Sequence, residues 1–88
     1  MELPVKYYEL KYGNDTDHAY IHLIREIGQI AYALETKNEP VFAAKVTEAI
    51  TLLKFLAHKH DVNIESSIET IYSKKLARIN SRDITENR

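Results

Sequence analysis

The chain has 88 residues, which indicates one domain. With 12 basic and 13 acidic side chains its formal net charge is −1, which argues against a protein that binds nucleic acid mainly through its phosphates. Because it contains no cysteine, disulfides, zinc–thiolate sites and thiol catalysis are excluded. No apolar run is long enough to cross a membrane and residues 1–4 lack the apolar core of a signal peptide, so we expect a cytoplasmic protein without a membrane partner.

The apolar residues recur at helical spacing almost throughout, which predicts an all-α fold. A short first helix is expected over residues 3–12, with Gly13 as its stop. Its apolar stripe consists of Leu3, Tyr7 and Leu10, with Tyr8 alongside. Asp15 or Thr16 is the expected N-cap of the next helix, because both side chains accept hydrogen bonds from free backbone N–H groups.

The second helix is expected from about residue 17 to residue 35. One wide apolar face is predicted to be core, and it comprises Tyr20, Leu23, Ile24, Ile27, Ile30, Ala31 and Leu34. His22, Glu26 and Gln29 lie together on one flank of that face. A third sector, pointing away from the core, holds Ile21, Gly28 and Tyr32. These three are either scattered surface hydrophobics or an oligomer contact in which the glycine allows close approach.

The third helix is expected over residues 40–59, beginning at Pro40, and it is apolar on most sides, which is typical of a central, buried helix. Its apolar stripes are Phe42, Val46, Ala49, Leu53 and Leu56, then Val41, Leu52 and Phe55, then Ile50 and Ala57. Glu48 lies beside the second stripe on the helical wheel. A carboxylate there needs a partner, because burying a bare charge is costly.

A fourth helix is expected from residue 64 to about residue 80, capped by Asn63. Its predicted core positions are Ile64, Ile68, Ile71, Tyr72, Leu76 and Ile79. Lys74, Lys75 and Arg78 give its last turns a positive face, which suits the helix dipole. We therefore expect a single helical domain over residues 1–80 and a polar, frayed tail over residues 81–88.

Two polar pairs are spaced three residues apart, Glu26 with Gln29 and Glu48 with Thr51. At that spacing the two side chains of each pair share one helix face. Two antiparallel helices can point all four groups at one place between them, where a helical bundle builds a metal or phosphate site.

Around these pairs the sequence resembles the MazG-like all-α nucleoside triphosphate pyrophosphohydrolases. His22-Leu-Ile-Arg-Glu-Ile-Gly-Gln-Ile-Ala-Tyr-Ala-Leu34 resembles the family's first metal-binding helix, and Thr47-Glu-Ala-Ile-Thr-Leu-Leu53 resembles the second. Leu56-Ala-His-Lys-His-Asp-Val-Asn-Ile-Glu65 resembles the loop into the last helix, Ser73-Lys-Lys-Leu76 its basic continuation, and Tyr7-Tyr-Glu-Leu-Lys-Tyr-Gly13 the leading helix. The likeness covers about residues 5–79, and it implies a four-helix bundle completed by oligomerisation, as a dimer or a larger assembly.

The resemblance implies hydrolysis of a nucleoside triphosphate to the monophosphate and pyrophosphate, with Mg²⁺ held by a Glu-x-x-Glu and a Glu-x-x-Asp pair. Glu26 and Glu48 match the first member of each pair, whereas Gln29 replaces the second Glu and Thr51 replaces the Asp. Arg25 stands where the family usually has one more Glu. A close charge pair contributes about 4 kcal/mol at a protein-like dielectric, so losing two carboxylates should weaken Mg²⁺ binding by orders of magnitude.

Two functions therefore compete. The first is a nucleotide pyrophosphohydrolase fold with Glu26 and Glu48 as remaining ligands and with catalysis weakened or lost. The alternative is a non-catalytic helical oligomer that binds nucleotides or a protein partner. In it the former ligands form a buried polar network, with Arg25 near Glu26 or Glu48.

Other side chains are candidates for contact with the substrate. His22, one turn before Glu26, is either a nitrogen ligand for a transition metal or a half-buried histidine hydrogen-bonded to Glu26. The basic candidates for phosphate contact are Arg25, Lys54, Lys75 and Arg78. A solvated basic face is the alternative interpretation of the lysines and of Arg78.

Overall fold

The computed structural model describes the backbone of residues 2–86 and the side chains of residues 2–81. Its four helices are α1 (Glu2–Tyr12), α2 (Thr16–Glu35), α3 (Glu39–Lys59) and α4 (Ile64–Glu86). Over this described range there is no strand, which confirms the predicted all-α class. No helix among these residues is both long and apolar enough to cross a membrane.

The helix ends follow the capping residues. Asp15 and Asn38 accept hydrogen bonds from the backbone N–H groups of His18 at 3.2 Å and Val41 at 3.3 Å, and so cap α2 and α3. Asn63 does the same for α4, because its Oδ1 accepts from Ser66 N–H at 3.0 Å. These contacts satisfy donors that the first helical turn leaves free. At the end of α1, Gly13 takes a φ of 55°, a conformation that favours glycine.

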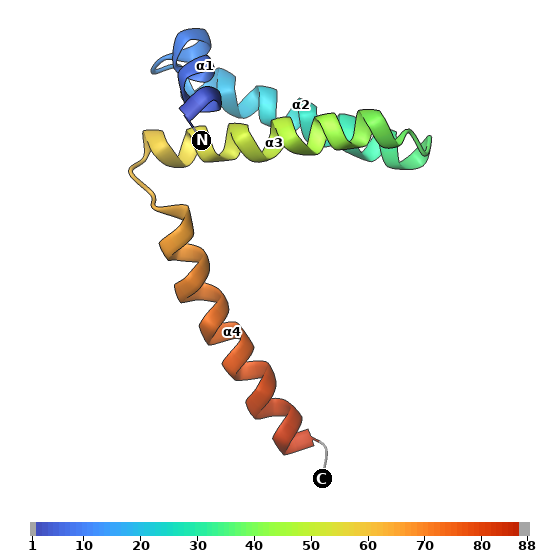
Figure 1. Ribbon diagram of the computed structural model, residues 1–88, viewed down its shortest axis with the longest axis vertical. Coiled ribbons are helices and arrows are strands. Elements are labelled where there is room, and N and C mark those ends of the chain that lie inside the picture. Colours follow the sequence, from blue (N-terminus) through green and yellow to red (C-terminus); the bar gives the residue numbers. More distant parts are fainter. Residues whose placement is uncertain (1, 87–88) are drawn as a thin grey trace.

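Helices α2 and α3 lie side by side and antiparallel, and α1 packs across one end of the pair (Figure 1). The small core between these three helices consists of Tyr8, Ala19, Leu23, Ala49, Leu52 and Phe55. Phe55 and Leu52 are its largest fully buried side chains, and the Tyr8 ring centroid lies 5.7 Å from that of Phe55. Lys59 also ties α3 to α1, since its Nζ donates to Glu9 Oε1 at 2.7 Å. As expected, α3 is the central helix.

Helix α4 projects away from the body formed by α1–α3 (Figure 1), so within one chain the helical bundle consists of these three helices. The predicted core positions on α4 are not buried, and those from Ile68 to Ile79 are between 47% and 60% exposed. The helix also runs to Glu86 rather than ending near residue 80. Residues 87 and 88 of the expected polar tail lie outside the described residues.

The buried face of α2 matches the predicted one only in part: Leu23 is buried and Ile30 is partly buried against the core, as predicted. Tyr20, Ile24, Ile27 and Leu34 are each more than half exposed, and Ala31 is exposed as well. The buried stripe is Ala19, Leu23, Glu26 and Ala33, which lies against α3. On α1, Leu3, Tyr7 and Leu10 are likewise exposed and Tyr8 is the buried residue. The reason is the position of α4. Because α4 does not pack against α1 and α2, only the sides of these two helices that face α3 are covered.

Candidate carboxylate site between the second and third helices

Glu26 is the one charged residue among the buried side chains of the described residues, with 5% of its side chain exposed. It occupies the buried stripe of α2, one turn after Leu23 on the side that faces α3. A buried carboxylate is stable only where charges or hydrogen-bond donors compensate for its lost hydration. Each of its two oxygens contacts a different side chain, and these two side chains belong to different helices.

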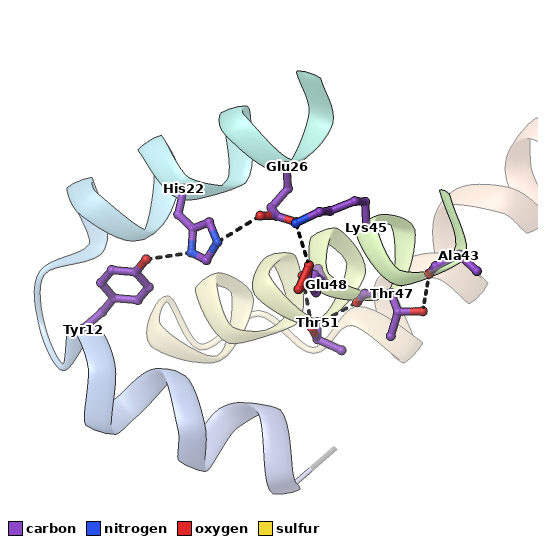
Figure 2. A network of polar contacts seen from close by, with 8 residues as sticks. All are labelled: Tyr12, His22, Glu26, Ala43, Lys45, Thr47, Glu48 and Thr51. Atoms are coloured by element: carbon purple, nitrogen blue, oxygen red, sulfur yellow. Dashed lines mark hydrogen bonds and ion pairs between the residues drawn. The ribbon is translucent and has the colours of Figure 1, made fainter. Parts of the chain in front are cut away.

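The first partner is His22. Its Nε2 lies 3.1 Å from Glu26 Oε1, while its Nδ1 lies 2.6 Å from the hydroxyl of Tyr12 (Figure 2). The contacts fit a tautomer in which the Tyr12 hydroxyl donates to Nδ1 and the Nε2–H group donates to the carboxylate. The interpretation of His22 as a half-buried histidine hydrogen-bonded to Glu26 is thus confirmed. The ring is held from both sides between α1 and α2.

The second partner is Lys45 of α3, which the sequence analysis did not single out. Its Nζ lies 3.5 Å from Glu26 Oε2 and 3.3 Å from Glu48 Oε1, between the two carboxylates (Figure 2). Partial burial opposes the charged form of Lys45, but the hydrogen bond to Glu48 and the charge of Glu26 outweigh it and raise its pKa. The spacing of three residues between Lys45 and Glu48 is a signal that could have identified it.

Glu48 contacts the same ammonium group as Glu26 but is less enclosed. Its side chain is 45% exposed, although Oε1 is buried. Apart from their contacts with Lys45 Nζ at 3.3 Å and 3.5 Å, Glu48 Oε1 and Glu26 Oε2 have no polar partner among the described residues. The partner that a carboxylate at this position requires is therefore Lys45, and not Arg25, which is exposed on α2.

The other two members of the predicted four-group site do not join the carboxylates. Gln29 is exposed on α2. Thr51 turns its hydroxyl back to its own helix, where it lies 3.0 Å from the carbonyl oxygens of Thr47 and Glu48 (Figure 2). The pKa of Tyr8 is raised by burial and, to a smaller extent, by the charges of Glu48 and Glu26, against a partly opposing effect of Thr51.

The donor set does not fit the Mg²⁺ site that the resemblance implies. Among the described residues there is no group of three or more histidine, aspartate or glutamate side chains able to hold a metal ion. Mg²⁺ requires oxygen ligands in near-octahedral geometry. Here two carboxylates face one another across an ammonium group, so the three side chains Glu26, Glu48 and Lys45 carry a combined charge of −1.

The basic candidates for phosphate contact lie apart from the carboxylates. Lys54 lines a cavity of about 380 Å³ at the corner between α3 and α4, with His58 and Asp61 among its neighbours. Lys75 lies on the exposed face of α4, with its Nζ 5.4 Å from the centroid of the Tyr72 ring. Arg78 is exposed on the same helix, which points away from the body (Figure 1). Within one chain, these side chains do not form a common site with Glu26.

Comparisons with protein-family models, curated proteins and solved structures find no match to this chain. The site is therefore interpreted from its own geometry.

Proposed function

We propose that this chain is a MazG-like helical protein whose ligand is a nucleoside triphosphate and whose pyrophosphohydrolase activity is weakened or lost. One observation carries the proposal. Glu26 and Glu48, the two residues that the resemblance aligns with metal ligands, come from two antiparallel helices and lie within 3.5 Å and 3.3 Å of the same atom, Lys45 Nζ. A convergence of carboxylates across a helix pair is how bundles build metal sites, through which the phosphates of a nucleotide would bind.

The same geometry supports weakened catalysis. Metal-dependent phosphoryl chemistry needs ions that neutralise the phosphates and activate a water molecule. With Gln29 exposed and the Thr51 hydroxyl directed to its own helix, the site offers two carboxylates, and an ammonium group already lies between them. We therefore expect little or no metal-activated attack on a triphosphate in this chain.

The proposed protein works as a homo-oligomer. In the single chain the apolar faces of α2 and α4 are both left exposed. The sector formed by Ile21, Gly28 and Tyr32 is exposed too, and the space beside the Gly28 α-carbon is open. A helix such as α4, with nothing packed along it, is marginal in water. Packing of these faces against further copies would bury them, which favours the oligomer interpretation of the sector over scattered hydrophobics.

The second candidate function is a non-catalytic oligomer that binds nucleotides or a protein partner. The ion pairs of Lys45 favour it, because they compensate the charges of the two carboxylates within the chain, without a metal ion. This candidate differs from the first in its expected turnover, which is none, and its protein-binding form differs also in that no triphosphate is bound.

The experiment that separates them measures binding and turnover on the same full-length chain. We expect a non-hydrolysable nucleoside triphosphate to bind in calorimetry, and pyrophosphate release with Mg²⁺ to be slow for every triphosphate tested. Glu35→Gln, an exposed carboxylate on the same helix, is the matched control for Glu26→Gln. Fast release that Glu26→Gln abolishes and Glu35→Gln spares would overturn the weakened activity. Failure of all triphosphates to bind would favour the protein-interaction module.

A further inference from the structure

We infer that the Lys45 ammonium group is a built-in cation that takes the place of a divalent metal between Glu26 and Glu48, so that removing it opens a divalent-cation site. The inference depends on three side chains of α2 and α3 and not on the identity of the ligand. It is tested by metal binding in the absence of nucleotide, so its outcome is independent of whether a triphosphate is bound.

The buried end of the site is Glu26. Its side chain is 5% exposed, and Oε2 is enclosed without any hydrogen-bond donor. Because His22 already serves Oε1, Lys45 is the positive group that compensates Oε2. A carboxylate oxygen that is enclosed and lacks a donor requires a cation beside it. Loss of the ammonium group leaves this requirement unmet.

The second wall of the site is Glu48, whose enclosed Oε1 also lacks a hydrogen-bond partner. The two oxygens lie 3.5 Å and 3.3 Å from one nitrogen, so a single cation interacts with both (Figure 2). Mg²⁺ in proteins is commonly held by one or two carboxylates with water molecules as the remaining ligands. Two carboxylates without the ammonium group match that pattern, whereas two carboxylates with it do not.

The site is partly exposed to solvent at Lys45. Its side chain is 27% exposed, and that of Glu48 is 45% exposed, so one side of the site reaches water while Glu26 closes the other. Shortening or neutralising Lys45 therefore leaves an open route for a hydrated ion and for the water ligands that it retains. The hard oxygen donors select Mg²⁺ or Mn²⁺ over softer metals.

The experiment titrates Mn²⁺ into the full-length chain and into Lys45→Met, which removes the charge and keeps most of the side-chain length. Free Mn²⁺ is followed by electron paramagnetic resonance, and the melting temperature is recorded with and without the ion. We expect Lys45→Met to bind Mn²⁺ at least tenfold more tightly than the native chain. Its melting temperature should rise with Mn²⁺, since a ligand of the folded state stabilises it by mass action.

Two further variants make the result specific. Lys74→Met removes a lysine charge from exposed α4 and should bind Mn²⁺ as weakly as the native chain. The double variant Lys45→Met/Glu26→Gln should lose the gained affinity, because it removes the buried ligand. The inference would be overturned if the native chain bound Mn²⁺ as tightly as Lys45→Met. It would also be overturned if the gained binding survived Glu26→Gln.

If Lys45→Met does not fold without metal, the same inference makes a second prediction. Millimolar Mn²⁺ or Mg²⁺ should then restore its helical circular dichroism, whereas the double variant should stay unfolded. A Lys45→Met chain that neither binds Mn²⁺ when folded nor is refolded by it would overturn the proposal. Lys45→Arg, which keeps a positive charge, should fold and bind no more Mn²⁺ than the native chain.

Discussion

Helices α1–α3 and helix α4 all carry apolar side chains at helical spacing, yet only the first three contribute buried side chains to the core of the described chain. In the body, Phe55 and Leu52 are fully buried and the charged group at the helix seam has partners on both sides. Along α4, the apolar side chains from Ile68 to Ile79 remain about half exposed. The difference teaches that an amphipathic pattern specifies which face of a helix is to be buried, but not whether the surface that buries it belongs to the same chain.

The largest expected effect is a loss of stability in the body formed by α1–α3. Phe55→Ala removes the largest fully buried side chain and should lower the free energy of unfolding by about 3–5 kcal/mol. Chemical denaturation followed by circular dichroism measures the loss. The matched variant is Ile79→Ala on α4, which should change the unfolding of a monomeric chain far less, because its side chain is 51% exposed. Equal losses at the two positions would mean that α4 is covered as completely as the body.

The contrast between the body and α4 also shows which structural features the sequence predicted correctly and which it did not. The helix positions other than the end of α4, the cap at Asn63 and the stop at Gly13 were correctly predicted, and Asp15 is the cap of α2 among the two candidates, because these features depend on neighbouring residues. The buried face of α2 was predicted correctly only at Leu23 and Ile30, because the burial of its other apolar residues depends on where α4 goes. That direction is set at the corner after α3, where Asp61 takes a φ of 56° and Val62 N–H bonds the Ala57 carbonyl at 2.9 Å.

The candidate site divides in the same way. The meeting of Glu26 with Glu48 and the bond from His22 to Glu26 followed from helix faces alone. The role of Lys45 did not, because a lysine on an amphipathic helix is ordinarily a solvated group. Only the packing of α3 against α2 brings its ammonium group to both carboxylates. Arg25, the cation that the sequence favoured, lies on a side of α2 that α3 does not cover.

The second prediction tests whether another copy covers α4. Ile68→Asp places a charge in the centre of the apolar stripe of α4, whereas Thr70→Asp places the same charge on a different face. If copies of the chain associate through this stripe, Ile68→Asp should weaken association at least tenfold, about 1.4 kcal/mol or more, since a buried unpaired carboxylate is unfavourable. Light scattering at micromolar concentration measures the change. A native chain that is monomeric under these conditions would contradict the proposed homo-oligomer.

A smaller effect compares two equivalent caps, one in each region. Asn38→Ala removes the N-cap of α3 and should lower the stability of the whole body by about 1 kcal/mol. Asn63→Ala removes the N-cap of α4 and should loosen that helix while leaving the unfolding midpoint of the body unchanged. Hydrogen exchange at α4 and α3 amides reports the two regions separately. Faster exchange throughout both helices in Asn63→Ala would show that they unfold as one unit.

The smallest expected effect is a pH dependence at the start of α2. The side-chain and backbone hydrogen bonds from His18 lower the pKa of Asp15, and the hydrogen bond to Asp15 raises the pKa of His18. Stability from the raised His18 pKa is fully present below about pH 6.5 and is lost as pH rises through the folded value. Stability from the lowered Asp15 pKa is present above about pH 3.9 and is lost as pH falls through the folded value.

The melting temperature should therefore be highest between these limits and should fall slightly from pH 6 to pH 8. Because both groups are at the surface, the fall should be reduced by salt. Asp15→Asn keeps a capping side chain but removes the charge that holds His18 protonated, so its melting temperature should lose this part of the fall. An undiminished fall in Asp15→Asn would assign the pH dependence to a different titrating group in the body, and would remove the Asp15–His18 pair as its source.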